Sequence, residues 1–94
     1  MALKGAATKS SKTMGNAVPQ QWSNNVLING LGAINTSHGW VGPLGVEFVE
    51  TGSTTVKING YNAGRYNDRM KNASGMPLAD YVTVNLSTNV FIGP

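Results

Sequence analysis

A short pattern, Ser-x-x-Val-x-Ile followed by glycine, occurs three times in this chain and constrains its fold more than any other feature. The matched residues are Ser23, Val26, Ile28 and Gly30, then Ser53, Val56, Ile58 and Gly60, then Ser87, Val90, Ile92 and Gly93. Successive serines lie 30 and 34 residues apart. Asparagine precedes the glycine in the first two copies, at Asn29 and Asn59, but not in the third. A motif that recurs three times is expected to build one structural unit three times.

Each copy is expected to form a strand followed by a tight turn. The Val-x-Ile spacing places both side chains on one face of a short strand, and Asn-Gly favours a hairpin turn because both residues tolerate positive φ. Similar alternation over residues 44–49 and 81–86 predicts two further strands. Residues 66–73 allow at most a short helical turn, closed by Gly75. With 12 glycines, the chain is predicted to be a small all-β domain of short strands and glycine-rich turns.

Three arrangements of the repeats are open from the residues alone. The repeats could be ordinary hairpins of a small barrel, because Val-x-Ile-Asn-Gly suits any strand and turn. They could stack as an array, although three copies without capping units are near the minimum for that. They could also close around an axis with pseudo-threefold symmetry, and a ring of this kind would match a trimeric partner. The serine that recurs three residues before each valine favours a shared unit over coincidence.

The charge pattern bears on the organisation of the chain and on its partners. The 94 residues suffice for one small domain. Charged residues make up 12% of the chain, against roughly 25% in an average soluble protein. Lys4, Lys9 and Lys12 lie close together near the start, so we expect a flexible basic N-terminal arm over residues 1–20 and a β domain over residues 21–94. No dense basic stripe is present to neutralise several phosphates, so nucleic acid is not expected as a partner.

Several kinds of processing and chemistry are excluded by the sequence. It contains no cysteine, which excludes disulfides, thiolate catalysis and cysteine-built zinc sites. The N-terminal segment has no apolar run of signal-peptide length, so we expect cytoplasmic synthesis without a signal peptide. Ser37 and His38 point to opposite faces of an extended chain, which prevents a catalytic dyad. Glu47 and Glu50 are expected to be solvated surface charges, so no catalytic residue is assigned and the chain is expected not to be an enzyme.

The segment STTVKINGYNAGRYND, residues 53–68, resembles the PAAR-repeat family. Members of that family carry a strand of the type Ser-x-x-Val-x-Ile-Asn-Gly, one spacer residue, the tetrapeptide Pro-Ala-Ala-Arg and a short run to Gly-Asp. In this chain the spacer is Tyr61, the tetrapeptide is Asn-Ala-Gly-Arg over residues 62–65, and the run ends at Asp68. Thr-Ser-His-Gly at residues 36–39 and Val-Phe-Ile-Gly at residues 90–93 also resemble family segments. The resemblance covers residues 20–94 and leaves the N-terminal arm outside.

The resemblance implies both a fold and a function. Proteins of the PAAR-repeat family are small conical β domains that cap the trimeric β-helical spike of contractile phage tails and type VI secretion systems, and they form the tip that meets the target membrane. By this resemblance the chain is expected to be a structural protein of the baseplate and virion of a phage tail, with one copy per spike trimer. Docking is expected to use strand edges and apolar side chains at a broad base, with brief membrane contact. The short chain, without a toxin domain before or after it, is expected to be a dedicated membrane-puncturing tip.

The signature tetrapeptide is degenerate in this chain. Asn62 replaces proline, which removes a fixed φ, and Gly64 replaces alanine. The arginine is retained as Arg65, and we expect it to form a structural ion pair with Asp68 rather than a binding site.

The ligands of the family's metal site are also missing. Family members typically bind zinc near the tip through three histidines and a cysteine, whereas this chain has one histidine and no cysteine. A tetrahedral site of that kind cannot form, so no metal and no cofactor is expected. His38 lies where a family ligand would lie, and it would hold a metal only if the carboxylates of Glu47, Glu50 or Asp68 converged on it. Apolar packing is expected to hold the tip, from Trp40, Phe48 and Phe91.

A second class of function is also compatible with the sequence. The basic arm and the aromatic side chains of Trp22, Trp40 and Tyr61 would suit a small β-barrel module that binds nucleic acid or carbohydrate. At least two of these three side chains are expected to be buried, because so small a core has few other aromatic residues. Binding of one chain per spike trimer would favour the tip, and a strong loss of ligand binding with salt would favour a nucleic-acid module.

Overall fold

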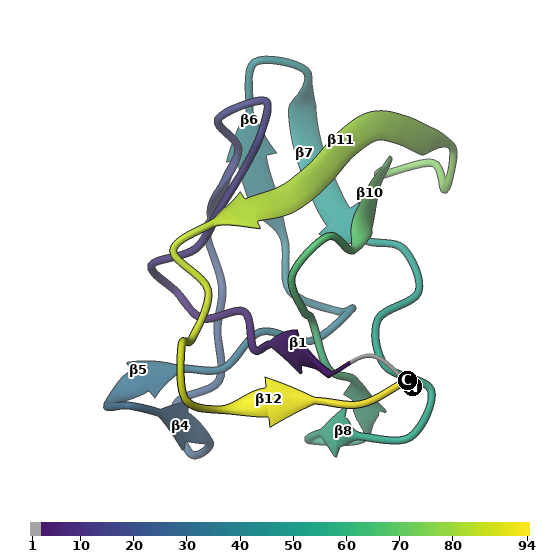
Figure 1. Ribbon diagram of the computed structural model, residues 1–94. Helices are drawn as coiled ribbons and strands as arrows, with labels where there is room; N and C mark the ends of the chain where they lie inside the picture. Colours follow the sequence, from purple (N-terminus) through teal and green to yellow (C-terminus); the bar gives the residue numbers. More distant parts are fainter. Residues whose placement is uncertain (1–2) are drawn as a thin grey trace.

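The computed structural model describes residues 3–94, which form twelve short strands and no helix (Figure 1). The strands are β1 (Lys4–Gly5), β2 (Lys12–Thr13), β3 (Val18–Pro19), β4 (Leu27–Ile28), β5 (Leu31–Gly32), β6 (Trp40–Gly42), β7 (Gly45–Val49), β8 (Lys57–Ile58), β9 (Tyr61–Asn62), β10 (Arg69–Asn72), β11 (Pro77–Val84) and β12 (Phe91–Ile92). The predicted all-β class is confirmed. The helical turn allowed for residues 66–73 does not form, because Asn67 takes a positive φ of 65° and β10 follows it directly.

Three two-stranded antiparallel ribbons form the lower part of the molecule (Figure 1). Two of them, β4–β5 and β8–β9, each close across an Asn-Gly turn. The φ angles are 54° and 79° at Asn29 and Gly30, and 52° and 87° at Asn59 and Gly60. Asparagine and glycine are favoured at these positions because other residues are strained at positive φ. The two hairpins predicted from the repeat are therefore confirmed.

The third ribbon joins the two ends of the chain. β12 pairs with β1 in the antiparallel sense, so N-terminal residues complete the third copy of the pattern (Figure 1). The chain then continues through the core, where Ala6, Ala7 and Ala17 are fully buried. The expectation of a flexible arm over residues 1–20, outside a domain that starts at residue 21, is wrong for the described residues 3–20. This segment supplies a missing strand, and its alanines fill part of the core.

The upper part of the molecule is a six-stranded sheet in the order β2-β11-β10-β7-β6-β3. Its outer strands meet through a turn, in which the Thr13 N–H donates to the Ala17 C=O (3.1 Å) and the Ala17 N–H donates to the Thr13 hydroxyl (2.9 Å). The sheet is therefore nearly closed into a barrel. In Figure 1 the molecule narrows from the three ribbons at the bottom to the β6–β7 turn at the top, in agreement with the expected small conical domain.

A ring of three hydrogen bonds marks a pseudo-threefold axis. Ala7 donates its N–H to Gly64 (3.0 Å), Gly64 donates to Ile34 (2.8 Å), and Ile34 donates to Ala7 (3.2 Å), in each case to the carbonyl oxygen. Isolated bridges around this ring join an alanine of one repeat to a residue of another: Ala6 with Arg65, Ala33 with Thr8, and Ala63 with Asn35. The repeats thus close around an axis, which excludes a stacked array.

Gly64 lies at the axis because Ile34 occupies the space that a third side chain would need. A Cβ at Gly64 would lie 3.2 Å from Ile34 Cγ2 and 3.4 Å from Ala7 Cβ. Close-packed interiors accommodate an added methyl group poorly. The glycine in the signature tetrapeptide therefore compensates for the large residue at the equivalent position of another repeat.

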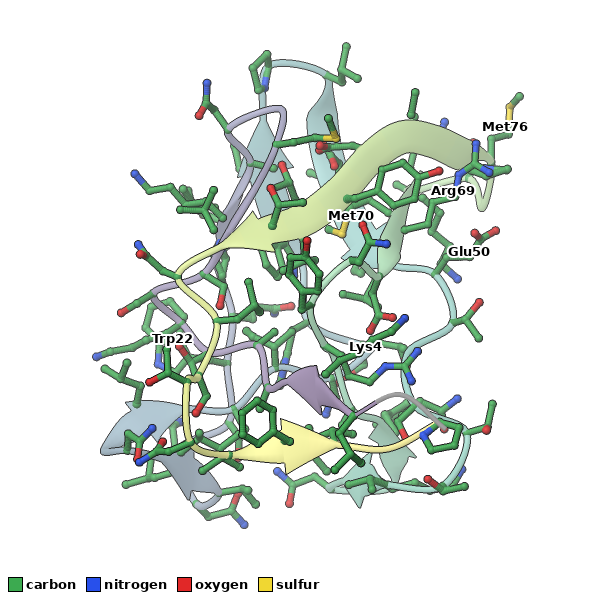
Figure 2. The ribbon with its side chains drawn as sticks, viewed as in Figure 1. Lys4, Trp22, Glu50, Arg69, Met70 and Met76 are labelled. Carbon is green, nitrogen blue, oxygen red and sulfur yellow. The ribbon has the colours of Figure 1, made fainter. Side chains whose placement is uncertain are left out.

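The core has two clusters. The lower one contains the isoleucines of the repeat, Ile28, Ile58 and Ile92, together with the alanines around the axis. The upper one contains Trp40 and Met70, which lies in the interior below β11 (Figure 2). The three aromatic residues expected to pack the tip do not gather there: Trp40 is fully buried and Phe48 half-buried, but Phe91 is exposed on β12 at the base. The expectation is wrong for Phe91 because β12 belongs to a ribbon rather than to the upper sheet.

Candidate functional site

The recurring serine fixes each base strand to the axial ring. In every repeat the serine Oγ accepts a hydrogen bond from the N–H of the valine three residues later, at 3.0, 3.0 and 2.9 Å. The N–H of each serine in turn donates to the carbonyl oxygen of the repeat alanine, which is Ala33, Ala63 or Ala6. A serine hydroxyl that accepts a nearby main-chain N–H is a common way to hold a tight turn. This contact explains why serine recurs three residues before valine.

Asparagine side chains link neighbouring repeats at the base. The amide of Asn29 donates to Ser87 Oγ (3.1 Å), and the amide of Asn59 donates to Ser23 Oγ (3.0 Å). Each amide also donates to the asparagine two residues after that serine, at 2.7 and 3.0 Å. The asparagine of the pattern therefore has two roles, since it permits the turn and it ties one ribbon to the next.

The third link between repeats uses the main chain in place of an asparagine. The main-chain oxygen of Pro94 accepts hydrogen bonds from the hydroxyls of Ser53 (2.8 Å) and Thr55 (2.6 Å). It also accepts the N–H groups of Thr54 (3.0 Å) and Thr55 (2.9 Å). The third copy of the pattern lacks asparagine, and Pro94 closes the ring of links at that position.

Arg65 connects the axial ring to two segments of the base. Its guanidinium donates to Asp68 Oδ1 (2.8 Å) and to the carbonyl oxygens of Gly93 (2.9 Å) and Gly52 (3.1 Å). Asp68 Oδ2 also accepts the main-chain N–H of Arg65 (2.7 Å). The ion pair predicted from the sequence is confirmed. It lies in the interior and serves as a clamp rather than as a ligand site.

Within residues 3–94, each ribbon leaves one strand edge free. In all three ribbons the repeat alanine donates its N–H to the carbonyl oxygen of the repeat valine, and the repeat isoleucine pairs with the facing strand. The residue between valine and isoleucine therefore directs its own N–H and C=O away from the ribbon. These residues are Leu27, Lys57 and Phe91. The base thus presents three equivalent strand edges around one axis.

Apolar side chains surround these strand edges. Leu3, Leu27, Tyr61 and Phe91 are each more than half exposed. Exposed apolar groups that gather at one end of a small domain mark an interaction surface more often than scattered ones do. We refer to these four residues together with Lys57 as the base face. It combines apolar area with unpaired main-chain groups, and it is the candidate functional site.

His38 closes the tight turn that follows Ile34 of the axial ring. Its Nδ1 accepts the N–H of Asn35 at 3.0 Å, and Ser11 and Asp68 accept the equivalent bond in the other two repeats. A ring nitrogen that accepts this bond belongs to a neutral imidazole with its proton on Nε2, and burial lowers the pKa of His38. Within residues 3–94 no three histidine or acidic side chains converge to hold a metal ion.

Replacement of His38 by aspartate is expected to remove a source of acid sensitivity. Because the pKa of His38 is lowered from 6.5 in the folded state, its contribution to stability is complete above that value and is lost as the pH falls through the folded pKa. Asp68 accepts the equivalent bond after Gly64, so an aspartate at position 38 should accept it as well, and it carries no imidazole to protonate. Urea unfolding at about pH 8 and about pH 5 should show a larger loss of stability for the wild type than for the variant. Equal losses would contradict this role.

Ser37 does not act with His38. Its hydroxyl donates to Asn35 Oδ1 at 2.6 Å, and the amide of Asn35 donates to the Ile58 carbonyl oxygen at 2.9 Å. Both side chains therefore hold the turn after the axial ring. The expectation that these neighbours form no catalytic dyad agrees with these contacts.

Glu47 and Asp80 form a buried carboxyl pair that the sequence did not indicate. Glu47 is 1% exposed on the inner face of β7, so the expectation of a solvated surface charge is wrong. Burial, followed by a hydrogen bond and charge repulsion from Asp80, raises the pKa of Glu47 to about 7. Glu50, by contrast, is only half-buried. The apolar neighbours Val46 and Phe48 concealed this burial, because the alternation along the strand predicts them inside and Glu47 outside. The sheet instead buries Glu47 and Val49 on one face of β7 and leaves Val46 exposed on the other.

Only one of the three aromatic residues considered for stacking is buried. Trp40 is inaccessible to solvent, whereas Trp22 and Tyr61 are exposed. The expectation that at least two of them would be buried is wrong. Alanine, isoleucine and valine fill the small core around the axis and leave no room for another ring.

Comparison with protein-family models, with curated proteins and with solved structures finds no match for this chain. Among the residues that the structure describes, no helix is long and apolar enough to cross a membrane.

Proposed function

We propose that this chain is a structural tip protein that caps the trimeric β-helical central spike of a contractile injection machine, in a phage tail. The observation that carries the proposal is the base, where three equivalent ribbons close around one axis. The links that run from Asn29 to Ser87, from Asn59 to Ser23 and from Ser53 to Pro94 give the ring its threefold order. The resemblance of residues 53–68 to PAAR-repeat proteins supports the same function.

A single chain with three equivalent edges suits a partner with three subunits. A trimeric β-helix ends in three equivalent strands, and unpaired strand edges accept further strands readily. Leu27, Lys57 and Phe91 offer one free edge to each subunit. The exposed apolar side chains of the base face supply the area that a stable interface needs. One chain per trimer follows, with the narrow end of the cone directed away from the spike and toward the target membrane.

The proposed docking is tested by the mass of the complex. The chain mixed with a trimeric β-helical spike fragment should give, by light scattering, one chain per trimer. A Leu27→Asp, Phe91→Asp double variant should bind at least about 100-fold more weakly, because two carboxylates would lose hydration in an apolar interface. Leu44→Asp is the matched control: Leu44 is exposed at the opposite end, and its variant should dock like the wild type.

Two outcomes would contradict the tip function. The first is a stable trimer formed by this chain alone, since a self-associating chain would occupy its own base face. The second is docking that survives the double variant unchanged, since the base face would then not carry the interface. Both outcomes are visible in the same scattering experiment.

A carbohydrate-binding role has weaker support. Trp22 lines an open groove of about 520 Å³ together with Gln20, Asn24 and His38, and such amide and aromatic groups suit sugars. However, Lys9 Nζ lies over the Trp22 ring, 5.6 Å from its centroid, and the ring packs closely on Gly32, where a Cβ would lie 2.5 Å from Trp22 Cδ1. The indole is therefore already engaged within the chain, and the tip function is preferred.

A further inference from the structure

Exposed apolar side chains gather at the end of the molecule opposite the base face. On the upper sheet Val18 of β3 pairs with Val41 of β6, and Val41 pairs with Val46 of β7, so that three exposed valines form a row. Leu44, in the turn between β6 and β7, is 71% exposed, and Met14, in the turn between β2 and β3, is 62% exposed. We call these five residues the apex patch.

The turn between β6 and β7 is short and protrudes from the upper sheet. β6 and β7 pair up to Gly42 and Gly45, so the loop between them is only Pro43 and Leu44. Gly45 has a φ of 102°, which lets so short a loop close without strain. No other atom would lie within 4 Å of a Cβ at Gly45, so the turn is free on this side. Figure 1 shows the β6–β7 turn as the point farthest from the ribbons.

Charge on the upper sheet is arranged with cations outside and carboxyl groups inside. Among the residues of its six strands, the charged side chains that reach the surface are those of Lys12, Arg69 and Lys71. Arg69 projects from the outer side of β10 (Figure 2). The only acidic residues on these strands, Glu47 and Asp80, are buried. The apex patch itself lies in segments without any charged residue, at positions 13–19 and 39–46.

This combination fits the surface of an anionic bilayer. Apolar side chains that protrude on a narrow turn enter the boundary between headgroups and acyl chains, where fluid lipid adapts to a convex shape. Cations further down the same sheet, of which Lys71 pairs with Phe48 of β7, attract anionic headgroups. A nucleic acid would use the cations but gain nothing from Leu44 and Val46. A folded protein partner would need a flatter surface to bury a comparable area.

We propose that the β6–β7 turn, with the apex patch around it, inserts shallowly into the interfacial region of anionic lipid bilayers. The inference rests on the proposed tip function, which directs this end of the cone toward a membrane, and it names the element that enters the lipid. The membrane contact then has a chemical component as well as a mechanical one. Leu44 is the leading side chain, and Lys12, Arg69 and Lys71 contact headgroups behind it.

Vesicle co-sedimentation of the full chain, without any spike, tests the inference. The protein should bind vesicles of phosphatidylglycerol and phosphatidylcholine, and should bind pure phosphatidylcholine vesicles at least about tenfold less well. Leu44→Asp should reduce binding to the anionic vesicles at least about tenfold, because a charged group is costly in the interfacial region. Leu27→Asp, which places the same change on the base face, should bind vesicles like the wild type. A thermal unfolding scan checks that both variants fold.

Three results would overturn the inference: no binding of the wild type to anionic vesicles, undiminished binding by Leu44→Asp, or an equal loss in Leu27→Asp. Equal binding to both kinds of vesicle would overturn the role of the cations. Leu27 and Leu44 are also substituted in the spike-docking experiment, where the expectations are reversed: the change at Leu27 should weaken docking and the change at Leu44 should not. A chain that docks on the spike but ignores vesicles therefore refutes the lipid inference alone. A chain that binds vesicles through Leu44 but ignores spikes refutes the proposed tip function.

Discussion

Arg65→Ala is expected to lower the free energy of unfolding by about 3–5 kcal/mol, the usual cost of removing one partner of a buried ion pair. The Asp68 side chain is only 5% exposed, so its carboxylate would keep little hydration and no counterion. The carbonyl oxygens of Gly52 and Gly93 would lose their donors at the same time. Both belong to segments that hold the third link of the base, so we also expect weaker docking on the spike.

Urea unfolding of matched variants measures this effect. Arg69→Ala removes an exposed arginine that bonds the Leu78 carbonyl oxygen and lies over the Tyr81 ring, and it should cost no more than about 1–1.5 kcal/mol. Arg65→Lys keeps the charge, but an ammonium group lacks the planar fork of a guanidinium and cannot contact Asp68 and both carbonyl oxygens at once. Its loss of stability should therefore lie between those of the other two variants. Asp68→Ala in the Arg65→Ala background should cost less than it does in the wild type, because the two side chains interact directly. A loss below about 1 kcal/mol for Arg65→Ala would contradict a buried clamp.

Local sequence signals predicted the parts of the fold that form within one repeat. Val-x-Ile and Asn-Gly identified two ribbons, since a strand and a two-residue turn need only neighbouring residues. The sequence shows the serine as a recurring position but does not show its role. Its hydroxyl accepts a main-chain N–H of its own turn in every repeat, and in two repeats it also accepts an asparagine amide from another ribbon. The asparagine links join residues 36 and 58 positions apart, and no local pattern indicates such a pair.

The third ribbon was missed because its two strands lie at opposite ends of the sequence. The available signal was the short match of Gly5-Ala6 with Gly32-Ala33, which marks the start of a repeat before the first serine. The three lysines near the N-terminus concealed it, since basic, low-complexity starts are typical of mobile arms. Their charges instead lie on the surface of segments whose alanines are buried. The lysines therefore predict the wrong start for the domain, whereas the match of Gly5-Ala6 with Gly32-Ala33 predicts the correct one.

Glu47→Gln is expected to stabilise the protein in mildly alkaline solution and to change its pH dependence. The pKa of Glu47 is raised from 4.5 to about 7 in the folded state, so the folded protein binds the proton more tightly than the unfolded chain. Stability from this group is complete below about pH 4.5 and is lost as the pH rises through 7. The loss is on the order of 3 kcal/mol. Glutamine has the same shape, stays neutral, and can donate to the Asp80 carboxylate.

The variant and the wild type should therefore diverge as the pH rises. In urea unfolding at about pH 5 and about pH 8, the advantage of Glu47→Gln should grow by about 2–3 kcal/mol. Glu50→Gln, which removes a carboxylate three residues further along at a half-buried position, is the matched control. Curves for Glu47→Gln that run parallel to those of the wild type would contradict the raised pKa of Glu47. Divergence would mean that the folded protein holds a neutral carboxyl group at Glu47 on the inner face of β7, below the apex patch.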